Sequence, residues 1–140
     1  MAQKIIADAS VIAKWFINEE NSKESRALLK RFISMQIELL EPSLLKYEVL
    51  NALRFTRNIE LSIKELEDVS EAIDSYGFEI KELDKDLSTK AIEISKTKDI
   101  SIYDAVYVAL AESTGSFLYT ADKKLMSDCK MDMIRHIKDL

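Results

Sequence analysis

Cysteine, proline and glycine are scarce in this 140-residue chain, and each scarcity excludes something. The one cysteine, Cys129, can form no disulfide within the chain and supplies too few thiolates for a cysteine-based zinc site. Two glycines and one proline leave little material for long loops, which predicts a chain built mostly of helices and strands. The cysteine count favours a reducing compartment, so we expect a cytoplasmic location.

Long apolar runs are also missing. Glu112 interrupts the longest apolar stretch well before the roughly 20 residues that a membrane-spanning helix needs, and no signal-like segment opens the chain, so we expect no membrane association. A hydrophobic content of 47% with 32% charged residues is typical of a globular protein, and the length suits one domain over residues 1–140. The net charge of −5 counts against a general polyanion-binding protein. It does not exclude nucleic acid, because acids that hold a metal cation are neutralised locally.

Strand-like and helix-like patterns alternate along the chain. Strands are expected at residues 4–7, 37–40, 78–83, 117–120 and 133–137. Helices are expected from about residue 10 and over residues 22–34, 43–56, 62–77, 84–96, 101–113 and 122–127. This alternation predicts an α/β fold with a central parallel sheet covered by helices on both faces. Ligands of such folds bind beyond the carboxyl ends of the strands.

Several boundaries carry local signals. Ser10 is a plausible N-cap for the first helix, and the pair Glu41–Pro42 is expected to close the second strand so that Ser43 caps the next helix. The segment 62–65 reads Ser-Ile-Lys-Glu, the pattern of a capping box. Gly77 is expected to stop the helix that begins there.

Four acidic residues stand where a charge is costly. Asp8 and Asp122 each follow an apolar strand-like run, whereas Glu48 and Asp104 interrupt apolar helix faces. A carboxylate in an apolar interior must be protonated, paired with a cation or bound to a metal. No basic residue shares the apolar face of Asp104, so a divalent metal is the natural remaining partner. Ligation by carboxylate oxygens alone suits Mg²⁺ or Mn²⁺ and suits zinc poorly.

Each acid also has a local explanation. Asp8 and Asp122 could simply cap the helices that follow them. Glu48 could pair with Lys46 or Arg54 at the rim of its helix. Asp104 is the hardest to explain in this way, and one shared site accounts for all four acids with a single reason.

Four segments, in this order, resemble the PIN domain family and more specifically the VapC toxins of VapBC toxin–antitoxin pairs. They are IADASV at 6–11, PSLLKYEVLNAL at 42–53, SIYDAVYVALA at 101–111 and LYTADKKL at 118–125. The resemblance implies a three-layer α/β/α fold around a central parallel sheet, and the activity of a Mg²⁺- or Mn²⁺-dependent endoribonuclease. It also implies a homodimer that is held by a VapB-like antitoxin.

The resemblance carries the family's acidic residues onto specific positions of this chain, which are Asp8, Glu48, Asp104 and Asp122. In the mechanism expected from it, Asp8 and Asp104 are the core metal ligands and Asp122 helps to hold the metal directly or through water. Glu48 orients or deprotonates the attacking water. Ser10 and Thr120 match hydroxyl positions that support these ligands by hydrogen bonding.

Other functions remain as alternatives. A catalytically inactive PIN scaffold that binds RNA or protein is one of them. A haloacid-dehalogenase-like phosphatase needs a second acid two residues after Asp8, where this chain has Ser10. A phosphorylated receiver domain fits poorly with Glu48 and Asp104 on helices. His136, the only histidine, lies in a terminal segment far from the four motif segments, and we expect no catalytic role for it.

Overall fold

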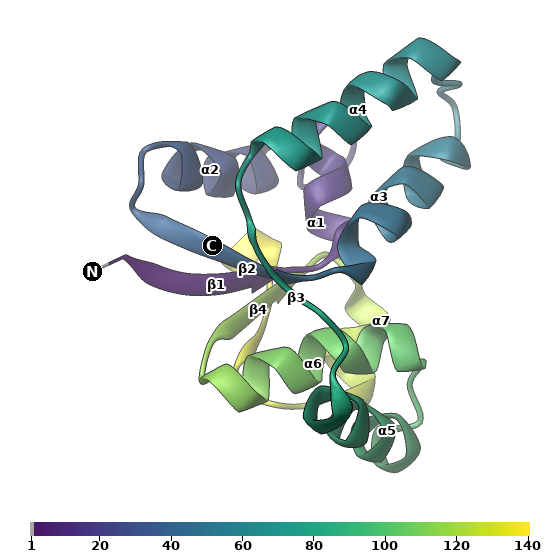
Figure 1. Ribbon diagram of the computed structural model, residues 1–140. Helices are drawn as coiled ribbons and strands as arrows, with labels where there is room; N and C mark the ends of the chain where they lie inside the picture. Colours follow the sequence, from purple (N-terminus) through teal and green to yellow (C-terminus); the bar gives the residue numbers. More distant parts are fainter. Residues whose placement is uncertain (1) are drawn as a thin grey trace.

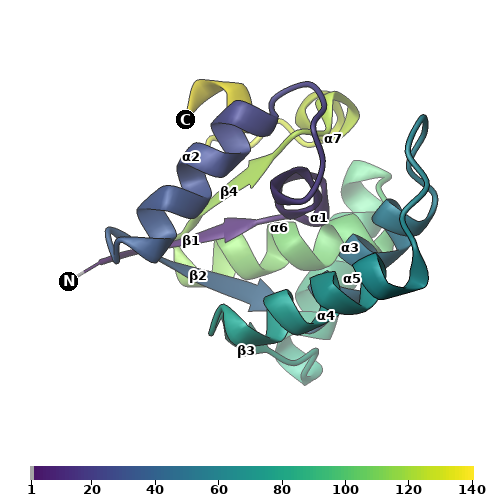
Figure 2. The same cartoon turned by 90° about the horizontal axis from the view of Figure 1, so that it is seen from above.

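A five-stranded parallel sheet forms the centre of the computed structural model, which describes residues 2–140. The strands are β1 (Gln3–Ala7), β2 (Ile37–Pro42), β3 (Glu79–Lys81), β4 (Phe117–Thr120) and β5 (Ile134–His136). Their order across the sheet is β3-β2-β1-β4-β5, and each pair of neighbours is parallel. The first strand is therefore the central one, as the view in Figure 2 shows.

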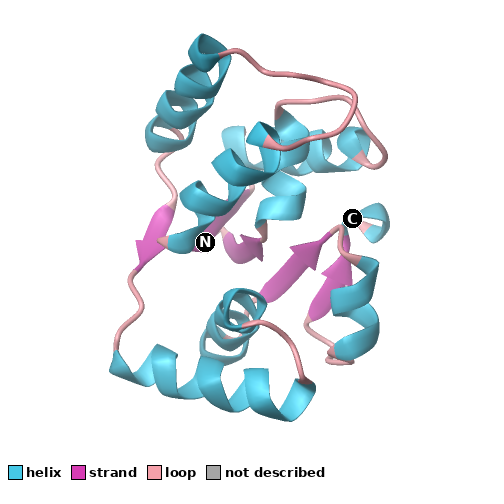
Figure 3. Cartoon of the chain, turned by 90° about the vertical axis from the view of Figure 1, so that its right-hand side faces the viewer, coloured by secondary structure: helices cyan, strands magenta, loops and turns pink. Residues whose placement is uncertain are grey.

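Helices cover the sheet on both sides (Figure 1). On one side lie α1 (Ala9–Ile12), α2 (Ser22–Ile33), α3 (Leu44–Arg54) and α4 (Ile63–Ser75), and on the other lie α5 (Lys85–Lys98) and α6 (Ile102–Thr114). The short α7 (Lys123–Asp128) packs beside β4 and β5, and two 3₁₀ turns follow α1 and β5 at Ala13–Trp15 and Ile137–Asp139. Figure 3 shows the same alternation of helix and strand from the side. The expected α/β/α fold with a central parallel sheet is confirmed. Within residues 2–140, no helix is long and apolar enough to cross a bilayer.

The core explains why α6 lies directly against the sheet. Seven consecutive residues of this helix, 105–111, are buried, and three of them are alanines. Small side chains let a helix approach a sheet closely, so α6 contacts β1, β2 and β4. This close packing brings the first turn of α6, with Asp104, toward the ends of the central strands.

Three predicted boundaries and one predicted cap were wrong in detail. The second strand does not stop before Glu41 but continues through Pro42, because both residues pair with β3. The third strand covers only 79–81 of the predicted 78–83. The first helix is a single α turn followed by a 3₁₀ turn, and its N-cap is Asp8 rather than Ser10. Ser43 stands at the N-cap position of α3 but its side chain makes no capping hydrogen bond.

The predicted capping box of α4 is confirmed. The Glu65 N–H donates to Ser62 Oγ at 3.1 Å, and the Ser62 N–H donates to Glu65 Oε1 at 3.0 Å. Gly77, with φ of +74°, follows the last turn in the left-handed conformation that glycine adopts without strain. The helix therefore begins and ends at residues that the sequence marks.

Ser62→Ala is expected to lower the free energy of unfolding by about 1 kcal/mol, because it leaves an N-terminal N–H of α4 without its acceptor. Equilibrium urea unfolding measures this change. Ser70→Ala in the middle of the same helix is the control, and helix propensity predicts a neutral or slightly stabilising effect there. Equal effects of the two substitutions would contradict a capping role for Ser62.

Candidate active site

The carboxyl ends of β1 and β4 meet at the point where the strand order reverses. From β1 the chain proceeds outward through β2 and β3, and it then returns to place β4 on the other side of β1. The Asp8 N–H, just past β1, donates to the Tyr119 carbonyl of β4 at 3.1 Å. Asp122 lies two residues past β4. In open α/β sheets, a reversal of this kind opens a crevice where ligands bind.

Asp8 is buried, with 6% of its surface exposed. Its Oδ1 accepts hydrogen bonds from the Ser10 N–H at 3.1 Å and from the Ser10 hydroxyl, so Asp8 does cap α1. Burial raises the pKa of Asp8 from 3.8 to about 6; hydrogen bonds from Ser10 and Thr120 oppose this rise, and the nearby charge of Asp104 adds to it. Asp8 therefore caps α1 and also belongs to the group of acidic residues.

Ser10 and Thr120 join the ends of β1 and β4. The Ser10 hydroxyl accepts from the Ala121 N–H at 2.9 Å and lies 3.4 Å from Thr120 Oγ1. Thr120 Oγ1 in turn accepts from the Asp122 N–H at 3.0 Å. The structure thus places both hydroxyl residues that the sequence singled out between Asp8 and Asp122.

Asp104 and Asp122 stand at the beginnings of α6 and α7. Asp104 lies in the first turn of α6, where its N–H donates to Ser101 Oγ at 3.0 Å. Burial raises the pKa of Asp104, and the charge of Asp122 raises it further. Asp122 Oδ1 accepts from the N–H groups of Lys124 and Leu125 at 2.9 and 3.3 Å, so Asp122 caps α7 through one of its two oxygens.

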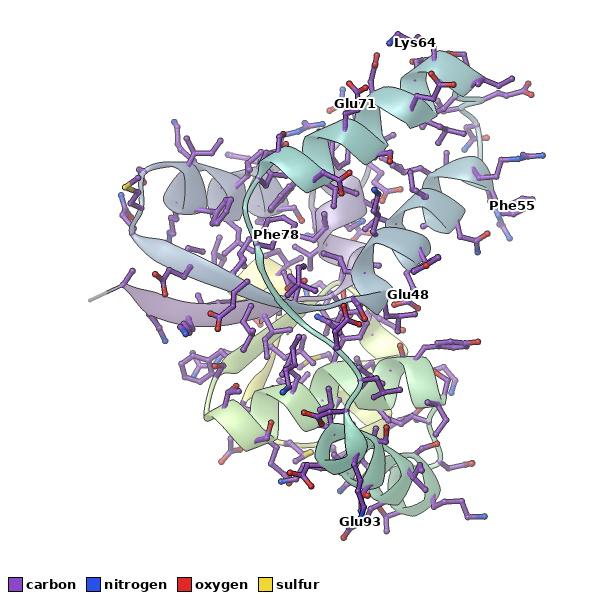
Figure 4. The ribbon with its side chains drawn as sticks, in the orientation of Figure 1. Glu48, Phe55, Lys64, Glu71, Phe78 and Glu93 are labelled. Atoms are coloured by element: carbon purple, nitrogen blue, oxygen red, sulfur yellow. The ribbon has the colours of Figure 1, made fainter. Side chains whose placement is uncertain are left out.

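Glu48 lies at the edge of the buried face of α3 rather than within it. The buried residues of this helix are Leu45, Val49 and Leu53. Figure 4 labels Glu48 on the part of α3 that is nearest to the layer of α6. Burial raises the pKa of Glu48, and the charge of Asp104 adds to that rise.

The pairing that we considered for Glu48 with Lys46 is not present. Lys46 Nζ bonds instead to Asp74 of α4, at 2.9 Å from both carboxylate oxygens. The Arg54 guanidinium lies over the Phe55 ring, 4.6 Å from its centroid. Glu48 therefore faces Asp104 and Tyr107 without the cation that the simplest explanation required.

Two residues behind these acids were missed by the sequence reasoning. Glu41 is completely buried, and its Oε1 accepts from the Ala7 N–H at 2.7 Å. Tyr107, only 1% exposed, lies three residues after Asp104 on α6. Burial raises the pKa of both side chains, and the charges of Glu48, Glu41 and Asp8 raise that of Tyr107 further. Nothing in the sequence showed that Glu41 is buried, because the following Pro42 indicated the end of the strand.

His136 is closer to the site than its place in the sequence suggested. It is buried on β5 and paired in register with Thr120 of β4. Its Nδ1 accepts from the Lys138 N–H at 3.1 Å. The statement that it lies far from every motif is therefore wrong, because strand pairing brings distant segments together.

The acids raise one another's pKa, and Lys124 opposes that rise only at Asp104 among them. Electrostatic coupling runs from Glu41 to Asp8, from Asp8 to Asp104, and from Asp104 to both Asp122 and Glu48. Among residues 2–140, no lysine, arginine or histidine forms a salt bridge with any of these five acids. Such a set of oxygens suits a hard divalent cation in its chemistry. In the same part of the chain, no three acidic, histidine or cysteine side chains are already gathered closely enough to hold one ion.

Comparisons with known proteins identify the family. Residues 5–128 match the family model of the PIN domain. Ribonuclease VapC3 of Pyrobaculum aerophilum is 33% identical in an alignment of 130 residues, which covers 87% of this chain and 92% of that protein.

Solved structures agree in fold. The crystal structure of PAE2754 from Pyrobaculum aerophilum has a TM-score of 0.72 at 19% identity, covering 99% of this chain and 85% of that one. A toxin–antitoxin complex from Klebsiella pneumoniae contains a chain with a TM-score of 0.69 at 14% identity, covering 93% and 94% of the two chains. The family match spans all four motif segments. This chain belongs to the PIN domain family.

Proposed function

We propose that this protein is a metal-dependent endoribonuclease and the toxin of a type II toxin–antitoxin system. The observation that carries the proposal is the buried Asp8, coupled to further carboxylates at the sheet's switch point and paired with no cation in the described chain. The similarity to Ribonuclease VapC3 supports RNA as the substrate.

We propose Mg²⁺ or Mn²⁺ as the cofactor. Asp8 and Asp104 would be its principal ligands, and Asp122 would bind through the oxygen that does not cap α7. Because these side chains are not yet gathered around one point, they would have to turn toward each other on binding. When bound, such a cation neutralises phosphate oxygens and lowers the pKa of bound water.

The protein's own groups have complementary roles in this proposal. Glu48, whose pKa is raised by burial, would accept a proton from the attacking water. Ser10 and Thr120 hold Asp8 and the start of α7 in a fixed relation through their hydrogen bonds.

Partners follow from the same similarity. The toxin–antitoxin complex from Klebsiella pneumoniae supports a protein antitoxin, and we propose a VapB-like partner and a homodimer. Large apolar side chains are exposed along α3 and the start of α4, among them Tyr47, Phe55 and Ile63 at 77%, 67% and 80%. Figure 4 shows Phe55 projecting away from the body of the molecule. An exposed apolar surface of this kind fits a protein partner. A cytoplasmic location accords with such a role.

Cleavage of structured and unstructured RNA by the purified chain tests the proposal. We expect cleavage with Mg²⁺ or Mn²⁺ and none with EDTA. Metal binding measured by calorimetry in parallel separates the alternatives. Metal binding without cleavage of any supplied RNA would direct attention to a more specific substrate. Absence of both would contradict the proposal and favour the inactive scaffold.

A further inference from the structure

The strands β1 and β2 separate before they reach the active site. Their pairing covers Gln3–Ile5 and Ile37–Leu39. Beyond it, β1 continues to pair with β4 through Ala7, and β2 pairs with β3 through Pro42. The last two residues of β1, Ile6 and Ala7, are therefore not paired with β2, and Asp8 follows directly after them.

This separation affects the Ala7 N–H. Along a strand, successive N–H groups point to opposite neighbours. The Asp8 N–H points toward β4, where it donates to the Tyr119 carbonyl at 3.1 Å. The Ala7 N–H therefore points toward β2, past the last residue pair that joins β1 to β2.

Glu41 supplies the missing acceptor with its side chain. Its Oε1 accepts from the Ala7 N–H at 2.7 Å, across the gap between the strands. The carboxyl is completely buried, and its Oε2 has no hydrogen-bond partner within residues 2–140. The carboxyl thus gives the Ala7 N–H its acceptor but leaves one of its own buried oxygens unpaired. The acid is thus costly for stability, which is typical of groups kept for function.

We propose that Glu41 is a positioning residue that fixes the end of β1 and thereby the direction of the Asp8 carboxylate. Asp8 directly follows Ala7, so its backbone is held from both sides, by Glu41 through Ala7 and by Tyr119 through its own N–H. Small displacements of a ligand are costly, because catalysis depends on geometry at the level of about 1 Å. This inference rests on the proposed function in taking Asp8 as a metal ligand.

Glu41→Leu and Glu41→Gln test the role. Glutamine keeps an acceptor oxygen for the Ala7 N–H, whereas leucine of similar size keeps none. For the leucine variant we expect Mn²⁺ affinity and kcat for RNA cleavage each to fall by about tenfold or more. For the glutamine variant we expect both within about threefold of the wild type, since the hydrogen bond is retained.

Ile94→Ala creates a cavity in the buried face of α5 and is the control for a merely structural effect. It is expected to lower Tm by more than Glu41→Leu does, and to leave Mn²⁺ affinity unchanged at temperatures where it is folded. If Glu41→Leu kept wild-type Mn²⁺ affinity and kcat, the proposal would be overturned. It would be overturned equally if Ile94→Ala lost metal affinity in proportion to its loss of stability.

Failure of the proposed function is distinguishable from failure of this inference. If the wild type neither binds Mn²⁺ nor cleaves RNA, the proposed function is contradicted but the positioning role of Glu41 is not. NMR then decides the latter: in Glu41→Leu the Ala7 amide should exchange faster and the Asp8 amide and carboxyl signals should shift. Unchanged signals at both residues would overturn the role of Glu41.

Discussion

Asp8→Asn is expected to reduce metal-dependent RNA cleavage by at least about 100-fold, which exceeds the usual loss for a group that only supports a ligand. Asparagine keeps the size of the side chain and an oxygen that can cap α1, but it removes the charge that a cation requires. Asp8 is the most buried of the four predicted acids and lies where β1 and β4 meet. The loss should therefore appear in Mn²⁺ affinity as well as in kcat.

The same substitution should leave the metal-free protein at least as stable as the wild type. Burial and the charge of Asp104 both oppose ionisation of Asp8, and asparagine carries no charge to repel. Lower activity with equal or higher stability distinguishes a functional group from a structural one. Asp104→Asn is expected to behave in the same way, because Asp104 is coupled to both Asp8 and Asp122.

Single-turnover cleavage and Mn²⁺ titration of the two variants check this prediction. Asp132→Asn is a matched control, because it removes an equal charge from an exposed position of the chain. Its activity and metal affinity should equal those of the wild type. Full metal-dependent activity in both Asp8→Asn and Asp104→Asn would contradict the assignment of the site.

The sequence was sufficient for the fold and for the candidate acids because both depend on local patterns. Apolar runs alternate with amphipathic segments, and this alternation alone indicates a parallel sheet between helices. Asp8 and Asp122 stand at the ends of such runs, and Asp104 stands in an otherwise apolar helix. Each is conspicuous because it breaks a local pattern, without any knowledge of its neighbours in space.

Glu41, Tyr107 and His136 could not be placed in this way, because their importance depends on contacts between distant segments. The pair Glu41–Pro42 was expected to close the second strand, yet the pairing of β2 with β3 keeps Glu41 within it. Tyr107 fits the apolar pattern of α6, and only the tertiary structure places it among carboxylates. His136 reaches Thr120 through the β4–β5 register, which the sequence does not specify. Strand register and burial are properties of the whole fold.

Between about pH 4 and pH 6, the metal-free protein is expected to lose stability as the pH rises. The pKa of Asp8 is about 6 when folded, compared with its ordinary value of 3.8. Below the ordinary value, folded and unfolded chains are both protonated and the full stability is present. Above it, the unfolded chain releases a proton that the folded chain retains, and stability falls until the pH passes about 6. For Asp8 alone, the difference amounts to about 3 kcal/mol of unfolding free energy.

Glu41, Glu48 and Asp104 act in the same direction, because the pKa of each is raised in the folded chain. Asp84 acts oppositely, since Lys81 lowers its pKa, but that ion pair is exposed and solvent screens it. The pH dependence of the unfolding free energy should therefore be set mainly by the buried acids of the site.

Urea unfolding at pH 4, 5, 6 and 7 in EDTA measures this dependence, and Asp8→Asn should reduce its slope. Added Mn²⁺ should restore stability at pH 7, by about 2.7 kcal/mol at a concentration 100 times the Kd. It should do little at pH 5, where protons compete for the same carboxylates. Parallel pH dependences for the wild type and Asp8→Asn would contradict the raised pKa of Asp8. Together, the two slopes would show that a bound cation relieves the cost of burying ionised Asp8, which weakens the free protein.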